Sequence, residues 1–318
     1  MSKTPDPAGP VAAATSSVAA APSSAAVASH TGVVSPWLAA APAVFVLLWS
    51  SGFLGAKYGL PYAPPATFLL LRFLIVIALM VPIALLVRAS WPTSVRQTGH
   101  ICVAGLLVQA GYLGGVYFAI DRGMSAGLVA LIVGLQPIVT AMFAAPLFGE
   151  RVSGRQWAGL MLGLGGTALV VGDKLSAAGL PVGAIGFSVI GLLSITFGTL
   201  YQKRFCGNFD LRSGSVIQFI VAALVIAPFA WLETRPVEWT VQFVGALGHL
   251  VVVLSIIAIS ILAIMIRRGA ATKVASLFYL VPPVTALIAF AMFGERLTGL
   301  AILGMAASVV GVFLVVRQ

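Results

Sequence analysis

Charged residues are scarce in this chain. Of its 318 residues, 8% are charged and 60% are hydrophobic, and the mean hydropathy is +1.09. Soluble domains carry about 25% charged residues, so the eight Asp and Glu and 18 Lys and Arg cannot cover a water-facing surface of this size. The composition excludes a soluble enzyme and a disordered scaffold, and it predicts an integral membrane protein.

Cysteine is also scarce, and the two cysteines, Cys102 and Cys206, lie far apart in or beside apolar runs. Their spacing supports no metal site, redox pair or disulfide framework. The chain also lacks a Gly-Lys-Ser/Thr phosphate loop and a His-Glu-x-x-His motif. We therefore expect no catalytic residues, no metal and no cofactor, and a membrane-embedded enzyme is the less favoured alternative.

Ten mostly apolar stretches follow one another along the chain, each long enough to cross the hydrocarbon core as a helix. Strand-like alternation is absent, and the connections are mostly short. The pattern predicts an all-α membrane protein with little chain left for another domain. The predicted spans are 37–57, 65–87, 98–120, 124–148, 154–171, 181–202, 214–231, 243–266, 271–293 and 298–316.

Residues 1–36 differ from the rest, because Ala, Ser, Pro and Val dominate and almost no charge is present. Such a segment cannot bury enough apolar surface to fold, so we expect a disordered cytoplasmic tail. The segment lacks the basic start and the directly following apolar core of a cleavable signal peptide. We expect the first span to act as an uncleaved signal anchor.

Positive charges indicate how the spans are inserted, because cytoplasmic loops carry more Lys and Arg than outer loops. With the amino terminus inside, twelve cations lie on the cytoplasmic side and five on the outer side. The sequence therefore predicts a multi-pass protein of a bacterial-type inner membrane with both termini in the cytoplasm. We expect the lipid bilayer as a partner and no nucleic acid. The outer cations are Lys57, Arg122, Lys174, Arg235 and Arg296.

The two halves of the chain resemble each other at an offset of 145 residues. The run Phe-Gly-Glu-Arg occurs at 148–151 and again at 293–296. Each half holds five predicted spans, an odd number, so the two copies must insert with opposite orientation. We expect two inverted five-helix repeats, at 37–172 and 173–318, and in secondary transporters such repeats form two gates around a shared site. Flanking residues also match: Pro137 with Pro282, Gly159 with Gly304, and Gly166 with Gly311.

Several short motifs occur at places typical of one transporter family. They are Leu-Trp-Ser-Ser-Gly-Phe at 48–53, Lys57, Arg72-Phe73, and the patterns Pro137…Gly149-Glu150 and Pro282…Gly294-Glu295. With these motifs, residues 37–318 resemble the EamA family of the drug/metabolite transporter superfamily. The resemblance implies ten helices, a central cavity, and export or exchange of small metabolites or drugs by alternating access. Ile195 and Gln218 replace Trp49 and Arg72 in the second repeat, so the halves are not chemically equivalent.

Arg72 is the one charged residue well inside a predicted span, about 10 Å from the outer end of that span. A central Arg costs about 2.5–3.5 kcal/mol on insertion scales. One interpretation is that Arg72 faces a cavity and attracts a substrate carboxylate or phosphate. The alternative is that the side chain snorkels outward or binds backbone carbonyls.

Uncharged polar and aromatic residues share helix faces within several spans. They are candidates for the lining of a central cavity together with Arg72. The alternative is that they form hydrogen bonds between helices, worth about 0.6 kcal/mol each. Such a cavity suits amphoteric or neutral solutes better than multiply charged ones. The candidates are Trp49, Gln109, Tyr112, Gln136, Tyr201, Gln218 and Tyr279.

Proline and small residues also recur at matching places. Pro137, Pro282 and Pro283 interrupt the fourth and ninth spans and are candidates for a hinge or a plain kink. Small residues in the fifth and tenth spans predict close helix packing, within the chain or in a homodimer. These residues are Gly159, Gly163, Gly166, Gly304, Ser308 and Gly311.

All eight acidic residues fall in the tail or in loops, so no carboxylate is available for a proton relay across the bilayer. His249, in the eighth span, is interpreted as a polar contact between helices rather than a relay. The sequence therefore favours a facilitator or exchanger of small metabolites, such as amino acids or related solutes. Efflux of drugs or toxic compounds is the alternative function.

Overall fold

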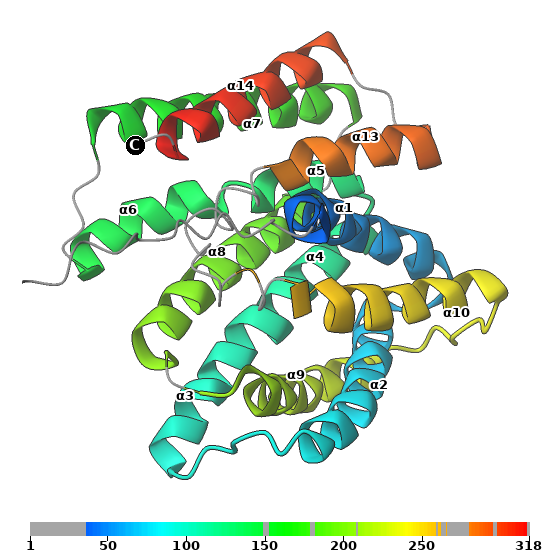
Figure 1. Ribbon diagram of the computed structural model, residues 1–318. Coiled ribbons are helices and arrows are strands. Elements are labelled where there is room, and N and C mark those ends of the chain that lie inside the picture. Colours follow the sequence, from blue (N-terminus) through cyan, green and yellow to red (C-terminus); the bar gives the residue numbers. More distant parts are fainter. Residues whose placement is uncertain are drawn as a thin grey trace, which may run out of the picture. The chain divides into compact units, whose positions relative to one another are not determined.

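Helices make up all the regular secondary structure of the described chain (Figure 1). The computed structural model describes residues 36–148, 153–178, 182–207, 209–258, 260–261, 265, 280–294 and 298–316. No strand occurs in these residues, which confirms the predicted all-α class for the described chain.

Most predicted spans correspond to one helix or to consecutive helical segments. Two segments, η2 and η3, are π-helical, and η1 is a 3-10 turn. The bounds are α1 Pro36–Gly59, η1 Leu60–Tyr62, α2 Pro65–Leu86, α3 Val95–Gly105, η2 Leu106–Gly111, α4 Tyr112–Asp121, α5 Ala126–Val133, α6 Gln136–Phe148, α7 Gly154–Ala178, α8 Val182–Phe205, α9 Leu211–Leu232, α10 Val241–Gly248, η3 His249–Ala258, α13 Val281–Phe293 and α14 Gly299–Val316.

Polar side chains set several helix starts. The Ser94 side chain caps α3 by accepting from the Gln97 amide, and the Thr240 side chain caps α10 by accepting from Phe243. Before α7, Ser153 and Gln156 exchange hydrogen bonds in a capping box. Thr298 caps α14 by accepting from the Ala301 amide. Ser153 and Thr298 are separated by the repeat offset, so the last helix of each half begins in the same way.

Seven helical stretches of the described chain are long and apolar enough to cross a membrane. They bear large exposed apolar side chains, such as Leu224 and Phe229 on α9. Exposed Trp residues lie near helix ends, as Trp231, Trp239 and Trp157 do, and Trp is enriched at membrane–water interfaces. The exposed surface is therefore suited to lipid along the helices and to the interface at their ends.

Some helix ends differ from the predicted spans. The first helix begins one residue earlier than predicted, at Pro36, and α7 continues to Ala178 rather than ending at 171. The fourth span is not one helix, because a turn at 134–135 separates α5 from α6 just before Pro137. Helices extend into polar turns that an apolar window does not detect, and a proline limits helix continuation on its N-terminal side.

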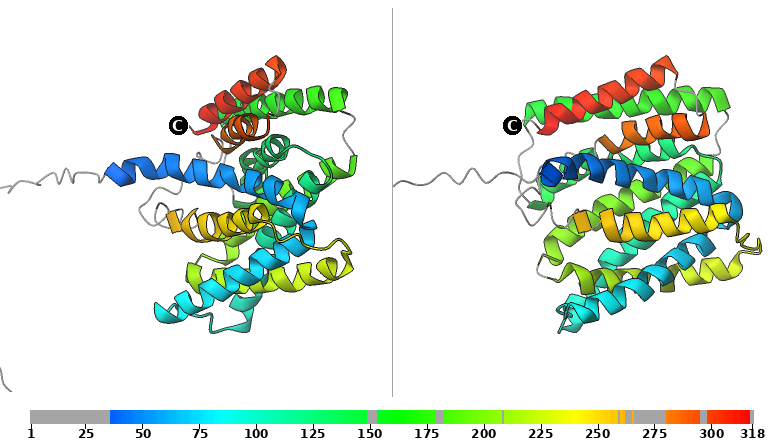
Figure 2. Two further views of the ribbon diagram at one scale, coloured as in Figure 1. Left: turned by 90° about the vertical axis from the view of Figure 1, so that its right-hand side faces the viewer. Right: turned by 45° about the vertical axis from the view of Figure 1, so that its right-hand side comes forward.

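Helices from the two halves pack in pairs. The closely packed pairs are α7 with α14, α2 with α9, α4 with α8, and α5 with α13. Figure 2 shows α7 and α14 side by side in both views. Further contacts join α1 to α10, η3 and α13, and join α8 to α3, η2 and α6.

Small residues bring α7 and α14 into backbone contact. A Cβ on Gly166 would meet the Gly304 carbonyl oxygen, and a Cβ on Gly311 would meet the Gly159 carbonyl oxygen. The Ser308 hydroxyl donates to the Gly163 carbonyl at 3.4 Å. The contact of Gly166 with 304–308 and that of Gly311 with 159–163 are reciprocal under the repeat offset, so the predicted small residues meet within one chain.

Candidate functional site

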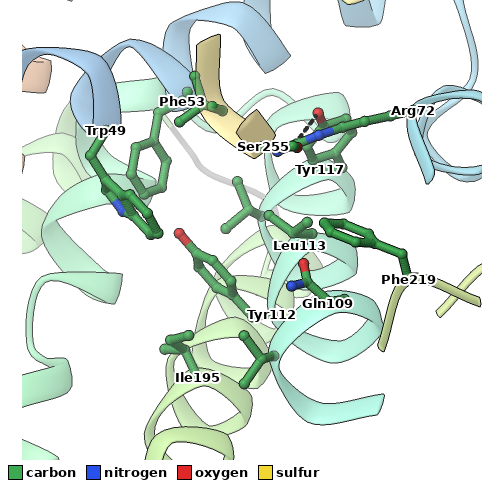
Figure 3. A pocket seen from close by; sticks show the side chains of 14 residues that line it. Trp49, Phe53, Arg72, Gln109, Tyr112, Leu113, Tyr117, Ile195, Phe219 and Ser255 are labelled. Carbon is green, nitrogen blue, oxygen red and sulfur yellow. Dashed lines mark hydrogen bonds between the residues drawn. The ribbon is translucent and has the colours of Figure 1, made fainter. Parts of the chain in front are cut away.

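A cavity of about 100 Å³ lies among helices of both halves. Its walls come from α1, α2, η2 and α4 in the first half and from α8, α9 and η3 in the second. Trp49 of α1 and Ile195 of α8 occupy matching positions in the two halves, each near the middle of its helix. Figure 3 shows these side chains around the cavity.

Most of the lining is apolar or aromatic. Phe53, Leu113 and Ile195 contribute side chains from three helices, and Phe219 closes the wall from α9. Gly52 leaves room beside Leu254, because a Cβ there would lie 3.2 Å from the leucine side chain. An apolar wall with few polar groups is typical of a small-molecule site.

Arg72 lies at one side of the cavity with two hydroxyl partners. Its Nη1 donates to the Tyr117 hydroxyl at 3.1 Å, and its Nη2 donates to Ser255 Oγ at 3.3 Å. The side chain is 7% exposed, so it does not snorkel to the surface. Figure 3 shows Arg72, Tyr117 and Ser255 together on one side and Trp49 on the other.

Four of the predicted lining residues, Trp49, Arg72, Gln109 and Tyr112, meet at this cavity. Gln136, Tyr201 and Gln218 do not line it. The Gln136 amide donates to Thr199 at 3.4 Å, and Tyr201 hydrogen-bonds His100 at 2.8 Å. Both contacts join two helices, which agrees with the alternative interpretation that these residues form hydrogen bonds between helices.

Gln218 lies where α9 packs closely against α3. Its backbone lies against Gly105 of α3, where an added Cβ would be 2.6 Å from the Gln218 Cα. The side chain is buried. Tyr279, the remaining candidate, lies outside the described residues.

Tyr117 and Ser255 were not singled out from the sequence, although both hold Arg72. They lie 45 and 183 residues from Arg72 along the chain. A Tyr or Ser in an apolar span has many possible neighbours, so no local pattern distinguishes these two. An unpaired Arg within a span was the available signal, since such a group needs polar partners.

Both π-helical segments contribute to the cavity wall. Gln109 belongs to η2, and Ser255 belongs to η3. Shifted by the repeat offset, η2 at 106–111 falls on 251–256, inside η3. π-helical turns are rare and often occur at functional sites, and here each half places one beside the same cavity.

The prolines singled out from the sequence lie at helix starts, whereas His249 makes a contact between helices. Pro137 lies in the first turn of α6, directly after the turn at 134–135, and Pro282 and Pro283 lie in the first turn of α13. His249 Nε2 lies 2.9 Å from Ser51 Oγ, a polar contact between η3 and α1.

Polar contacts join the two halves near the connection between α1 and α2. The Glu233 carboxylate accepts from the amides of Ala66 and Thr67, at 2.9 and 2.7 Å. Arg235 donates to the Leu60 carbonyl at 3.0 Å and lies 3.6 Å from the Asp121 carboxylate. We call Glu233, Arg235, Asp121 and their partners the clasp.

Two cations next to the clasp lie over aromatic rings of the other half. Lys57 Nζ is 4.4 Å from the centroid of the Phe293 ring, and Arg122 Cζ is 4.4 Å from that of Phe187. Such cation–π contacts add attraction. Three of the cations that the sequence assigns to the outer loops, Lys57, Arg122 and Arg235, thus contact the opposite half.

One sequence pattern resembles a hydrolase motif but has another role. Gly123–Gly127 reads Gly-x-Ser-x-Gly, which in hydrolases forms a strained turn between a strand and a helix. Here the run joins α4 to α5, and Ser125 caps α5 by accepting a hydrogen bond from the Leu128 amide.

Burial raises the pKa of the Cys206 thiol. The described residues contain no group of three or more His, Cys, Asp or Glu able to hold a metal ion.

Curated relatives of similar length carry transporter names. A protein of Escherichia coli (strain K12) named "Probable amino-acid metabolite efflux pump" is 29% identical over 281 residues, covering 85% of this chain and 91% of the relative. The "Uncharacterized inner membrane transporter YedA" of that strain is 28% identical over 283 residues, covering 88% and 90%. The "Uncharacterized transporter YvbV" of Bacillus subtilis (strain 168) is 28% identical over 263 residues, covering 80% and 84%.

A solved structure shares the fold. Its TM-score is 0.63 at 19% sequence identity, and the match covers 86% of this chain and 94% of that chain. The EamA-like transporter family model matches twice, at residues 36–172 and 182–317. With transporter-named relatives and several membrane-length helices, this indicates a membrane transporter rather than an enzyme. The chain belongs to the EamA-like transporter family, whose domain it carries twice.

Proposed function

We propose that this protein is a secondary transporter that moves small metabolites, such as amino acids or related solutes, across a bacterial-type inner membrane by alternating access. The cavity is the main support for this function, because its walls come from matching helices of both halves: α1, α2 and η2–α4, and α8, α9 and η3. A site shared by two repeats is exposed to one side or the other when the repeats move against each other.

The proposal includes ten membrane spans in two inverted five-helix halves. In the proposed count, α3–η2–α4, α5–α6 and α10–η3 are each one span, and α13 ends the ninth. The packing pairs support the inversion: exchanging each span for its repeat partner turns the α1 contacts with η3 and α13 into the α8 contacts with η2 and α6. The reciprocal contact of Gly166 and Gly311 has the same symmetry.

The clasp supports a gate at one side of the membrane. With both termini in the cytoplasm, as the positive charges favour, the clasp residues Asp121, Glu233 and Arg235 lie at the outer side. Every clasp contact joins one half to the other. We infer that the clasp is the outer gate in its closed form, which must open for release of the solute outside.

The size of the cavity favours metabolites over drugs. Drug-sized ligands occupy pockets of about 300–1,000 Å³, whereas this cavity measures about 100 Å³. One relative is named a probable amino-acid metabolite efflux pump. Efflux of larger toxic compounds is the second candidate function, and the cationic dyes in the counterflow experiment below test it.

Counterflow into liposomes tests the function. Purified protein in liposomes loaded with unlabelled solute should concentrate the labelled solute transiently, for at least one class among amino acids, nucleosides, sugars and cationic dyes. Trp49→Ala removes a lining side chain and should lower flux severalfold, while Trp157→Ala, at an exposed site on α7, should leave flux unchanged. No flux above that of empty liposomes for every class would contradict the proposal.

A further inference from the structure

The guanidinium group of Arg72 is buried in the cavity wall with neutral partners. Tyr117 and Ser255 accept hydrogen bonds from Nη1 and Nη2, and the buried Nε has no hydrogen-bond partner in the described residues. A buried charge is tolerated when it is paired and fully hydrogen-bonded. Two hydroxyl groups do not neutralise it, so an anion would be stabilised beside Arg72.

No carboxylate in the described chain pairs with Arg72. None of the 14 lining residues is acidic. Glu233 lies at the C-terminal end of α9, where it accepts from Ala66 and Thr67, and Asp121 pairs with Arg235. Among the described residues, Arg72 therefore has no acidic partner with which the anion of a solute would have to compete.

The rest of the cavity fits an apolar group. Opposite Arg72 lie Trp49, Tyr112 and Ile195, and Leu113 lies between the two sides (Figure 3). The volume of about 100 Å³ limits the solute to a small molecule. The solute that matches both sides has an anionic end and an apolar body.

The charges of the lining residues also indicate which anionic group the cavity would match best. Arg72 is the single cation among the lining residues, so a group with one negative charge is matched better than a phosphate with nearly two. A planar guanidinium also pairs with a carboxylate in a bidentate manner. Because no lining residue is a carboxylate, an ammonium group of the solute has no charged partner.

We propose that Arg72 selects a small solute with one carboxylate and an apolar body, and that the cavity does not recognise an ammonium group. This assignment rests on the proposed function, because it gives the solute class of the same cavity. It differs from amino-acid recognition, in which both the carboxylate and the ammonium are bound.

Equilibrium binding to the purified full chain tests the proposal, with five compounds that share one branched aliphatic body. They are leucine, 4-methylpentanoate, which lacks the ammonium, 4-methylpentanamide, 3-methylbutylamine, which lacks the carboxylate, and 3-methylbutyl phosphate. By calorimetry, 4-methylpentanoate should bind at least as tightly as leucine and at least tenfold more tightly than the amide or the amine. The phosphate should bind no more tightly than 4-methylpentanoate.

Three results with the native chain would overturn the proposal: equal binding of the amine and the acid, tighter binding of leucine or the phosphate than of 4-methylpentanoate, or no binding of the acid at millimolar concentration. The comparison needs no substitution, so it does not depend on the folding of a variant. Because binding does not require turnover, failure of counterflow alone would contradict the proposed function, whereas loss of the binding preference alone would contradict this inference.

Substitutions then assign the selectivity to Arg72. Arg72→Gln should bind the acid and the amide equally, and Arg72→Lys should keep part of the preference. Arg96→Gln removes an exposed cation at the start of α3 and should keep all of it. A folded Arg72→Gln variant that still prefers the acid tenfold would contradict the role given to Arg72.

Discussion

Glu233 joins α9 to the first turn of α2. Its two oxygens accept from the amides of Ala66 and Thr67 and from the Thr67 hydroxyl, at 2.9, 2.7 and 2.8 Å. The first amides of a helix have no partner within the helix, and a negative charge is stabilised near that end. The carboxylate therefore acts as a helix cap that is supplied by another helix.

Glu233→Ala should destabilise the protein because it leaves the amides of Ala66 and Thr67 without this acceptor. Loss of a helix cap costs about 0.5–2 kcal/mol, so the melting temperature of the purified protein should fall by a few degrees. Glu238→Ala serves as the matched control, since its side chain is exposed and its hydrogen bonds with Tyr62 and Thr240 are made by its backbone. Equal melting temperatures for the two variants would show that Glu233 is not a cap.

Local sequence signals located part of the site. Arg72 and Trp49 stand out because a charge or a large aromatic group is conspicuous in an apolar run, and both line the cavity. Tyr201 has the same appearance in sequence, yet it bonds His100. Whether such a residue lines the cavity or bonds a neighbouring helix depends on which helices pack together. The residue pattern within one span does not give this information.

Among the helices, α7 and α14 show most clearly how small residues determine packing. Gly166 faces the backbone of α14, whereas its neighbour Gly165 is exposed, with open space where a Cβ would be. Contact between the two backbones is possible only where no side chain stands between them. Substituting each of these two neighbouring glycines in turn therefore distinguishes the effect of helix packing from the intrinsic effect of replacing a glycine within a helix.

Gly166→Leu should force α7 away from α14, while Gly165→Leu should be tolerated. Overpacking costs about 1–3 kcal/mol or more, so the first variant should melt at a lower temperature or yield less folded protein. Size-exclusion chromatography and thermal unfolding in detergent measure both effects. If the Gly165 variant were the less stable of the two, the packing described for α7 and α14 would be incorrect.

Helix positions followed from the sequence more readily than helix irregularities. Apolar length predicted the main helices to within a few residues in most cases, and Pro137 marked the break between α5 and α6. The π-helical segments η2 and η3 were not predicted. No local pattern distinguishes them, because their residues have the same apolar composition as ordinary spans.

At the scale of the whole molecule, the two family domains share one cavity and one clasp. The repeat was visible in the sequence because charged and proline-containing motifs recur at a fixed offset. The asymmetry within the cavity was visible too, since Ile195 stands where the first half has Trp49. The clasp was not, because Asp121, the last residue of α4, and Arg235, in the loop after α9, are distant in sequence.

In the proposed transport cycle, two halves with opposite orientation enclose a cavity that opens to either side in turn. Gly154 and Gly299 are separated by the repeat offset, are exposed, and have open space for a side chain. Each therefore accepts a cysteine at the start of the last helix of its half, in a variant whose Cys102 and Cys206 are replaced by serine.

The most direct test is labelling of intact cells with a membrane-impermeant thiol reagent. Gly299→Cys should be labelled from outside, and Gly154→Cys should be labelled only after the membrane is permeabilised. Labelling of both cysteines from the same side would contradict the inverted arrangement, and the proposed transport cycle with it.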